Sequence, residues 1–123
     1  MDLQQDLPIQ QKPITRKFVI EEVGPFHVFS LEGRVDSFNF DDVKNALLGL
    51  ASKHAHGLAV NLEKAEFLSI PFIKLMAEVA DKLKASDARL ALVAPTEKIK
   101  RQIDIFASLD DMVIYRSRQH LEG

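Results

Sequence analysis

Hydrophobic positions change their spacing along the chain, and the spacing predicts strands alternating with helices. Over residues 16–31, large apolar side chains alternate with polar ones around a Gly24-Pro25 turn, which indicates an antiparallel hairpin. Residues 58–62 and 90–93 are short and almost continuously apolar, as expected of strands that are covered on both faces. We therefore expect a sheet whose central strands are fully buried.

The first helix is expected after a polar loop over residues 32–37. Asn39 is a suitable N-cap, Asp42 takes the third helical position of a capping box, and Phe38 and Val43 have the spacing of a hydrophobic staple. The inward stripe of this helix is expected to contain Val43, Ala46, Leu47, Leu50 and Ala51.

Two further helices are predicted between the later strands. One runs from Pro71, a residue suited to the first helical turn, to Ala85, and the other is capped by Thr96. A last strand is expected over residues 112–115. Because helices separate the apolar strands, the order ββαβαβαβ predicts an α/β fold with a mixed sheet and parallel later strands. The inner face of the second helix is predicted to contain Phe72, Ile73, Met76, Val79, Ala80 and Leu83.

Composition indicates one ordinary globular domain. The chain has 123 residues, of which 46% are hydrophobic and 28% charged. Residues 1–15 contain four glutamines and two prolines and are expected to form a flexible tail, residues 16–117 the domain, and residues 118–123 a C-terminal tail. No apolar run approaches the ~20 residues that span a bilayer, and the first residues lack the features of a signal peptide. We therefore expect a cytoplasmic, bacterial-type domain without direct membrane insertion.

Charge and motif content argue against several classes of function. A net charge of -2 gives no electrostatic reason to expect nucleic acid as a partner, and the absence of cysteine excludes disulfides and thiolate chemistry. No phosphate-binding glycine loop or hydrolase motif is present, so neither an enzyme nor a cofactor is expected. His54 and His56 are interpreted as loop residues rather than metal ligands. Asp36 and Glu66 are a carboxylate pair only if folding brings them together.

Several motifs, in collinear order over residues 17–117, resemble the STAS family, the domain shared by sulphate transporters and anti-sigma factor antagonists. The similar segments are Gly-Arg-Val-Asp at 33–36 (family Gly-Glu-Leu-Asp), Leu-Ala-Val-Asn-Leu at 58–62 (family Leu-Val-Leu-Asp-Leu), Ala-Glu-Phe-Leu at 65–68, and the last two strands at 89–95 and 109–115. The resemblance implies a STAS-like sheet with helices packed on it.

The resemblance also implies a protein-binding module in transcription signalling that docks onto an anti-sigma factor or a serine kinase-like protein and is switched by phosphorylation. The family sequence Asp-Ser-Ser-Gly-Leu corresponds to Ser-Ile-Pro-Phe-Ile at 69–73, so Ile70 replaces the usual phospho-acceptor and Phe72 the glycine. Ile70 and Phe72 either fill the core, or at least one of them lies at a docking surface. The expected partner-binding residues are Asp36, Ser37, Phe38, Ser69, Ile70, Pro71 and Phe72.

Three functional hypotheses follow from this comparison. The first is a docking module without the usual switch, which binds its partner constitutively or assembles with other STAS proteins, including as a homodimer. The second keeps a switch by phosphorylating Ser69, the hydroxyl next to the replaced acceptor. The third is a STAS regulatory subunit of a separate transporter.

Overall fold

The computed structural model describes residues 18–54 and 56–122, and the element order confirms the predicted ββαβαβαβ arrangement. The predicted N-terminal tail, residues 1–15, lies outside the described residues. The elements are β2 (Phe18–Val23), β3 (Phe26–Val35), α1 (Phe40–Lys53), β4 (Leu58–Leu68), α2 (Ile70–Ala85), β5 (Leu90–Val93), α3 (Glu97–Phe106), the 3₁₀ turn η2 (Leu109–Asp111), β6 (Met112–Tyr115) and the 3₁₀ turn η3 (Arg118–Glu122).

The described strands form a five-stranded sheet in the order β2-β3-β4-β5-β6. β2 and β3 are antiparallel, whereas β3, β4, β5 and β6 are parallel to one another, as predicted. Val23 pairs with Phe26, and Gly24 makes the intervening turn with a φ of 57°. The two continuously apolar segments lie in adjacent strands, β4 and β5, and are buried.

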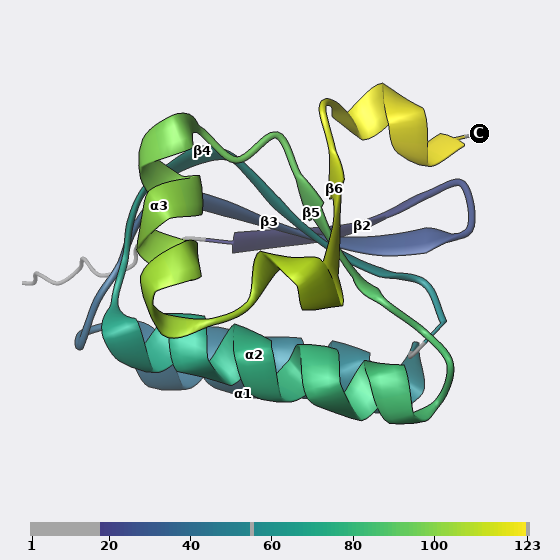
Figure 1. Cartoon of the computed structure of the whole chain (residues 1–123), viewed down its shortest axis with the longest axis horizontal. Coiled ribbons are helices and arrows are strands. Elements are labelled where there is room, and N and C mark those ends of the chain that lie inside the picture. Colours follow the sequence, from purple (N-terminus) through teal and green to yellow (C-terminus); the bar gives the residue numbers. More distant parts are fainter. Residues whose placement is uncertain (1–17, 55, 123) are drawn as a thin grey trace, which may run out of the picture.

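Helices α1 and α2 lie side by side on one face of the sheet, and α3 packs at the end where α2 begins (Figure 1). The inner stripe predicted for α2 is buried throughout, because its residues recur at intervals of three and four and face the sheet. Thr96 caps α3 as predicted, its Oγ1 accepting a hydrogen bond from the Ile99 N–H at 3.2 Å. Over residues 18–54 and 56–122, no helix combines the length and apolarity that crossing a bilayer requires.

Strands β3 and β4 are both longer than their hydrophobic patterns predict. β3 continues through the expected loop to Val35, and β4 continues to Leu68. Two shifts in the β3–β4 register explain the difference, because each adds a residue to β4 and breaks the alternation of apolar side chains. Gly33, with a φ of 74°, lies at the second shift and adopts a conformation that L side chains rarely take.

The predicted C-terminal tail is wrong for residues 118–122. These residues form η3, which lies on the face of the sheet opposite α1 and α2 (Figure 1). Leu121 is buried there in a second apolar cluster, and the Arg118 guanidinium forms an ion pair with Glu21 on β2. A single leucine among polar residues gives no periodic signal, so only the tertiary structure reveals this packing.

Candidate functional site

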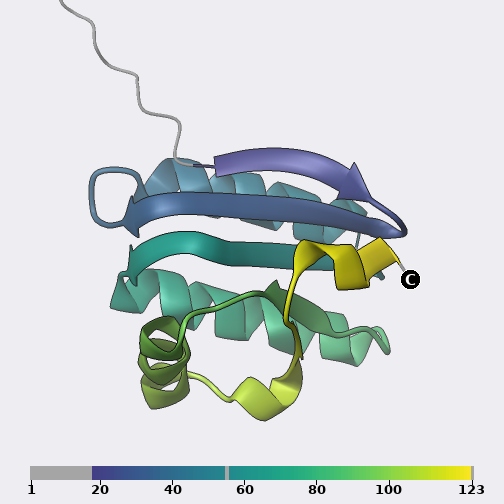
Figure 2. The same cartoon turned by 90° about the horizontal axis from the view of Figure 1, so that it is seen from above.

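The predicted partner-binding residues gather where β3 and β4 end. Val35 is in register with Leu68, and the Ser69 N–H donates to the Val35 carbonyl at 2.9 Å. Because the two strands are parallel, the loop after β3 and the turn after β4 emerge at the same edge of the sheet, on the left in Figure 2. Folding thus brings residues 36–38 and 69–71 together.

The loop between β3 and α1 is held by hydrogen bonds from two side chains. Asn39 Oδ1 accepts from the Asp36 N–H at 3.0 Å, while Asn39 Nδ2 donates to the Arg34 carbonyl at 2.9 Å. Asp36 Oδ1 accepts from the Phe38 N–H at 3.0 Å. Asn39 does occupy the N-cap position of α1, but its side chain makes no capping hydrogen bond, because both its polar atoms bond back to the loop.

Phe38 extends into solvent from this loop. It is 96% exposed, so the predicted staple with Val43, which is fully buried, does not form. The Phe38 N–H is fixed by Asp36, which turns the loop outward before α1 begins. An exposed phenylalanine on an ordered loop is a suitable anchor for a protein partner, because covering its ring removes a large apolar area from water.

The two apolar residues that flank Pro71, at the turn between β4 and α2, lie in different environments. Helix α2 begins at Ile70, one residue before the predicted start, and Ser69 is its N-cap, with Oγ accepting from the Phe72 N–H at 3.4 Å. Ile70 is 45% exposed, whereas Phe72 is fully buried in the core beneath the helices. The expectation that Phe72 contacts a partner is therefore wrong, since its ring points inward, whereas Ile70 remains available.

Helix α3 supports this turn through Gln102, which is not among the site residues predicted from the sequence. Gln102 Oε1 accepts a hydrogen bond from the Leu68 N–H at 3.4 Å. The bond joins the last residue of β4 to α3, directly before Ser69. A glutamine on a helix carries no sequence signal for such a contact, because the two residues are far apart in the chain.

A hollow of ≈ 530 Å³ lies beside the β3–α1 loop, and Asp36 and Glu66 both line it. The other lining residues are Gly33, Arg34, Phe38, Asn39 and Asp42. Folding therefore brings the two carboxylates to one hollow, although no direct contact joins them among the described residues. Arg34, whose guanidinium lies 4.4 Å from the centre of the Phe67 ring, contributes positive charge at its wall.

Neither the hollow lined by Asp36 and Glu66 nor the histidine side chains form a metal centre in the part of the chain that the structure describes. No group of three or more histidine and carboxylate side chains there is arranged to hold an ion. The His54 ring stacks on His27, with centroids 3.4 Å apart and planes inclined by 12°. His27 and His54 are far apart in the sequence, and only the packing of the α1 C-terminus against β3 brings the two rings together.

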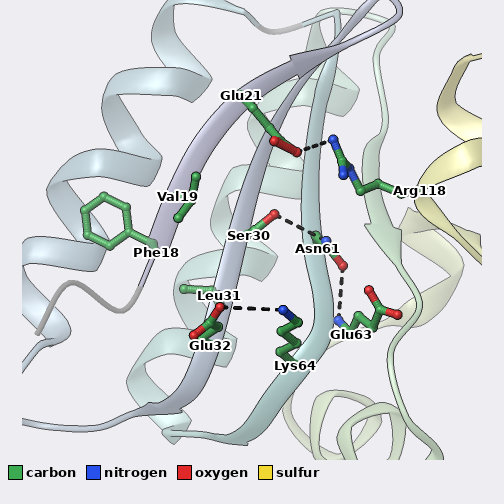
Figure 3. A pocket seen from close by; sticks show the side chains of 10 residues that line it. All are labelled: Phe18, Val19, Glu21, Ser30, Leu31, Glu32, Asn61, Glu63, Lys64 and Arg118. Atoms are coloured by element: carbon green, nitrogen blue, oxygen red, sulfur yellow. Dashed lines mark hydrogen bonds and ion pairs between the residues drawn. The ribbon is translucent and has the colours of Figure 1, made fainter.

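A second, polar hollow of ≈ 260 Å³ lies on the face of the sheet opposite α1 and α2 (Figure 3). Asn61 is buried beneath it, donating from Nδ2 to Ser30 Oγ at 3.2 Å and accepting from the Glu63 N–H at 3.1 Å. Ion pairs Glu32–Lys64 and Glu21–Arg118 flank it. Asn61 accepts the hydrogen bond of a backbone N–H at the first shift in the β3–β4 register, so its buried amide has a structural role.

Comparison with known proteins agrees with this architecture. The family model described as STAS domain matches residues 17–121. An anti-sigma factor antagonist from Mycobacterium paratuberculosis superposes with a TM-score of 0.74 at 18% identity, covering 91% of this chain and 95% of that one. The anti-sigma factor antagonist SpoIIAA in its unphosphorylated form gives 0.64 at 19% identity, covering 81% and 88%, respectively.

The phosphorylated form of SpoIIAA, described as a Bacillus cell fate determinant, superposes with a TM-score of 0.67 at 16% identity. It covers 85% of this chain and 96% of that one. At these identities the solved structures establish the fold alone. No curated protein matches this sequence.

Proposed function

Because the chain belongs to the STAS domain family, we propose that it is a non-catalytic, cytoplasmic docking module that resembles an anti-sigma factor antagonist but lacks the usual serine switch. The observation that carries the proposal is the half-exposed Ile70 at the start of α2, where the family resemblance puts the phospho-acceptor. Isoleucine has no hydroxyl to phosphorylate. It offers apolar surface instead.

The proposed docking surface consists of Asp36, Ser37, Phe38, Ser69, Ile70 and Pro71. Phe38 and Ile70 supply exposed apolar area from adjacent connections, and the hydrogen bonds of Asp36 and Ser69 hold those connections in place. A preorganised surface loses little conformational entropy on binding. The partner class that fits is an anti-sigma factor, a serine kinase-like protein or another STAS protein, bound without a preceding phosphorylation step.

The test is a pull-down from the native cell with the wild-type chain, followed by calorimetry with the captured partner and Ile70→Asp. Covering the exposed part of Ile70 is worth about 1 kcal/mol, and burying an aspartate carboxylate without a partner costs at least about 1–3 kcal/mol more, because the penalty is larger for charged groups than for neutral ones. We therefore expect the Kd to rise at least about 30-fold.

Ile114→Asp is the matched control, because Ile114 is similarly exposed, at 41%, but lies on the far edge strand β6. It should bind like wild type. Wild-type affinity of Ile70→Asp, with an unchanged circular dichroism spectrum, would refute the docking surface.

The alternative function is a phosphorylation switch at Ser69, one residue before the usual acceptor position. A phosphate there would lie at the N-terminus of α2, where the helix dipole favours negative charge. It would also replace the hydroxyl that caps the Phe72 N–H. Incubation with the cognate kinase and ATP, followed by mass spectrometry, separates the two functions. Stoichiometric phosphorylation of Ser69 would support the moved switch, and an unmodified Ser69 would support constitutive docking.

A further inference from the structure

The polar hollow on the open face of the sheet has a floor made by two side chains from neighbouring strands. Ser30 on β3 is in register with Asn61 on β4, and both line the hollow (Figure 3). Val19 on β2 pairs with Ser30 on its other side and is 54% exposed. Arg118, in η3, lines the end of the hollow at the top of Figure 3. The hollow is therefore a depression across neighbouring strands of one sheet.

The floor has hydrogen-bond donors that the fold leaves unused. Asn61 is only 9% exposed, and its Oδ1 accepts from the Glu63 N–H at 3.1 Å. This bond fixes the orientation of the amide, because a flipped amide would put two donors against each other. Asn61 Nδ2 carries two hydrogens, yet Ser30 Oγ, at 3.2 Å, is its one acceptor among the residues that the structure describes. The second Nδ2 hydrogen and the Ser30 hydroxyl hydrogen can therefore both bond to an oxygen atom in the hollow.

The charged side chains of the hollow favour a cation over an anion. Its lining contains the carboxylates Glu21, Glu32 and Glu63 but only two cations, Lys64 and Arg118. Both cations already have a carboxylate neighbour, since Arg118 pairs with Glu21 and Lys64 Nζ is 3.9 Å from Glu32 Oε2. Glu63 is exposed and has no ion-pair partner within residues 18–54 and 56–122. The net charge of the lining is thus negative, with Glu63 as the carboxylate that is free to pair.

We propose that the hollow binds a small organic cation that also has an uncharged oxygen acceptor, as amino acid amides and amino alcohols do. The oxygen accepts hydrogen bonds from Asn61 Nδ2 and the Ser30 hydroxyl, and the ammonium group pairs with the Glu63 carboxylate. Residues 61 and 63 are about 7 Å apart along the strand, so a short molecule with its oxygen and nitrogen on adjacent carbon atoms reaches both groups. The exposed side of Val19 packs against those carbon atoms.

The size of the hollow limits the ligand further. Its volume is ≈ 260 Å³, below the roughly 300–1,000 Å³ of pockets that hold drug-sized molecules. The Glu32–Lys64 pair at its rim is exposed and loose, so it opens at little cost when a ligand enters. Binding here uses none of the residues of the docking surface proposed above, so the two proposals stand or fall separately.

The first test is a ¹⁵N–¹H NMR titration of the full chain with four matched probes. Glycinamide has both groups, propylamine has only the ammonium, acetamide has only the oxygen acceptor, and acetate is an anion. At a pH of about 6.5 the amino group of glycinamide is protonated, because a free α-amino group has a pKa of about 7.7–8.0.

Glycinamide should shift the side-chain amide signals of Asn61 saturably. It should bind at least about fivefold more tightly than propylamine or acetamide, because each of these lacks one of the two polar contacts. Equal affinities for glycinamide and propylamine, a preference for acetate, or no saturable shift with any probe would overturn the proposal.

The second test removes the charge of Glu63. Glu63→Gln keeps the size of the side chain and should raise the Kd of glycinamide about threefold or more, the effect of losing an exposed ion pair. Glu66→Gln is the matched control, because Glu66 is an exposed carboxylate on the same strand that does not line this hollow. It should bind glycinamide like wild type. Equal effects of the two substitutions, or an unchanged Kd for Glu63→Gln, would refute the assignment of the ligand to this hollow.

Discussion

The two apolar residues beside Pro71 are expected to respond oppositely to truncation, although they are separated by a single proline. Phe72→Ala empties a fully buried aromatic site between the sheet and the helices. Replacing a buried phenylalanine by alanine costs about 3–5 kcal/mol, because transfer energy is lost and a cavity remains. A small domain has only about 5–15 kcal/mol of total stability, so this variant should be close to unfolding.

Ile70→Ala is the internal control. Ile70 is 45% exposed, so truncation loses roughly half of the 1.5–3 kcal/mol that full burial would supply. Alanine recovers about 0.4 kcal/mol through its higher helix propensity. The net loss should be about 1 kcal/mol or less.

Urea denaturation followed by circular dichroism measures both values. With a slope of about 2 kcal/mol/M, Phe72→Ala should lower the midpoint by about 2 M and Ile70→Ala by less than about 0.5 M. The midpoints can be compared in this way when the slope of the free energy of unfolding against urea concentration is the same in both variants, and the same curves measure that slope. Similar shifts for the two variants, or a loss below about 1 kcal/mol for Phe72→Ala, would refute the separation of core and surface at this turn.

Three other side chains give further expected outcomes. Ser69→Ala should destabilise the domain by about 1 kcal/mol in urea melts through loss of the α2 cap; an unchanged midpoint would contradict that role. Asn61→Leu should lower the free energy of unfolding by about 1–3 kcal/mol in the same urea melts, because the Glu63 N–H loses its acceptor. Asn61→Asp should avoid most of this loss, because aspartate keeps an acceptor oxygen for that N–H. The hydrogen bond from Lys100 lowers the pKa of Glu97, so the pair stabilises the fold at neutral pH and this contribution disappears as pH falls through the lowered value. Lys100→Ala should raise the pKa of Glu97 toward its ordinary value in an NMR carboxyl titration, and an unmoved titration would exclude the pairing.

Part of the site could be predicted because adjacent parallel strands end at one edge of a sheet. Once the order of elements is known, the connections after β3 and β4 must lie close together, and with them Asp36 and Ser69. The same topology brings Asp36 and Glu66 to one hollow. Gln102 was not predictable, because its bond to Leu68 depends on how α3 packs at that edge.

Elements that are stabilised by local interactions could be predicted from the amino-acid sequence alone. Continuous apolar runs gave β5 with its correct bounds, repeats of three and four residues gave the inner face of α2, and Thr96 marked the start of α3. In each case the signal and the structure lie within a few residues of each other. Periodicity and capping are therefore sufficient to predict them.

Features that depend on residues distant in the sequence could be established only from the folded structure. Ile70 and Phe72 are both large and apolar, and the orientation of α2 on the sheet makes one a surface residue and the other a core residue. Asn39 bonds back to its loop instead of capping α1, and Leu121 is buried because η3 folds over the open face of the sheet. These outcomes depend on long-range packing. Hydrophobicity gives a side chain its tendency to be buried, but the surface of the same chain that packs against it determines which side chains are covered.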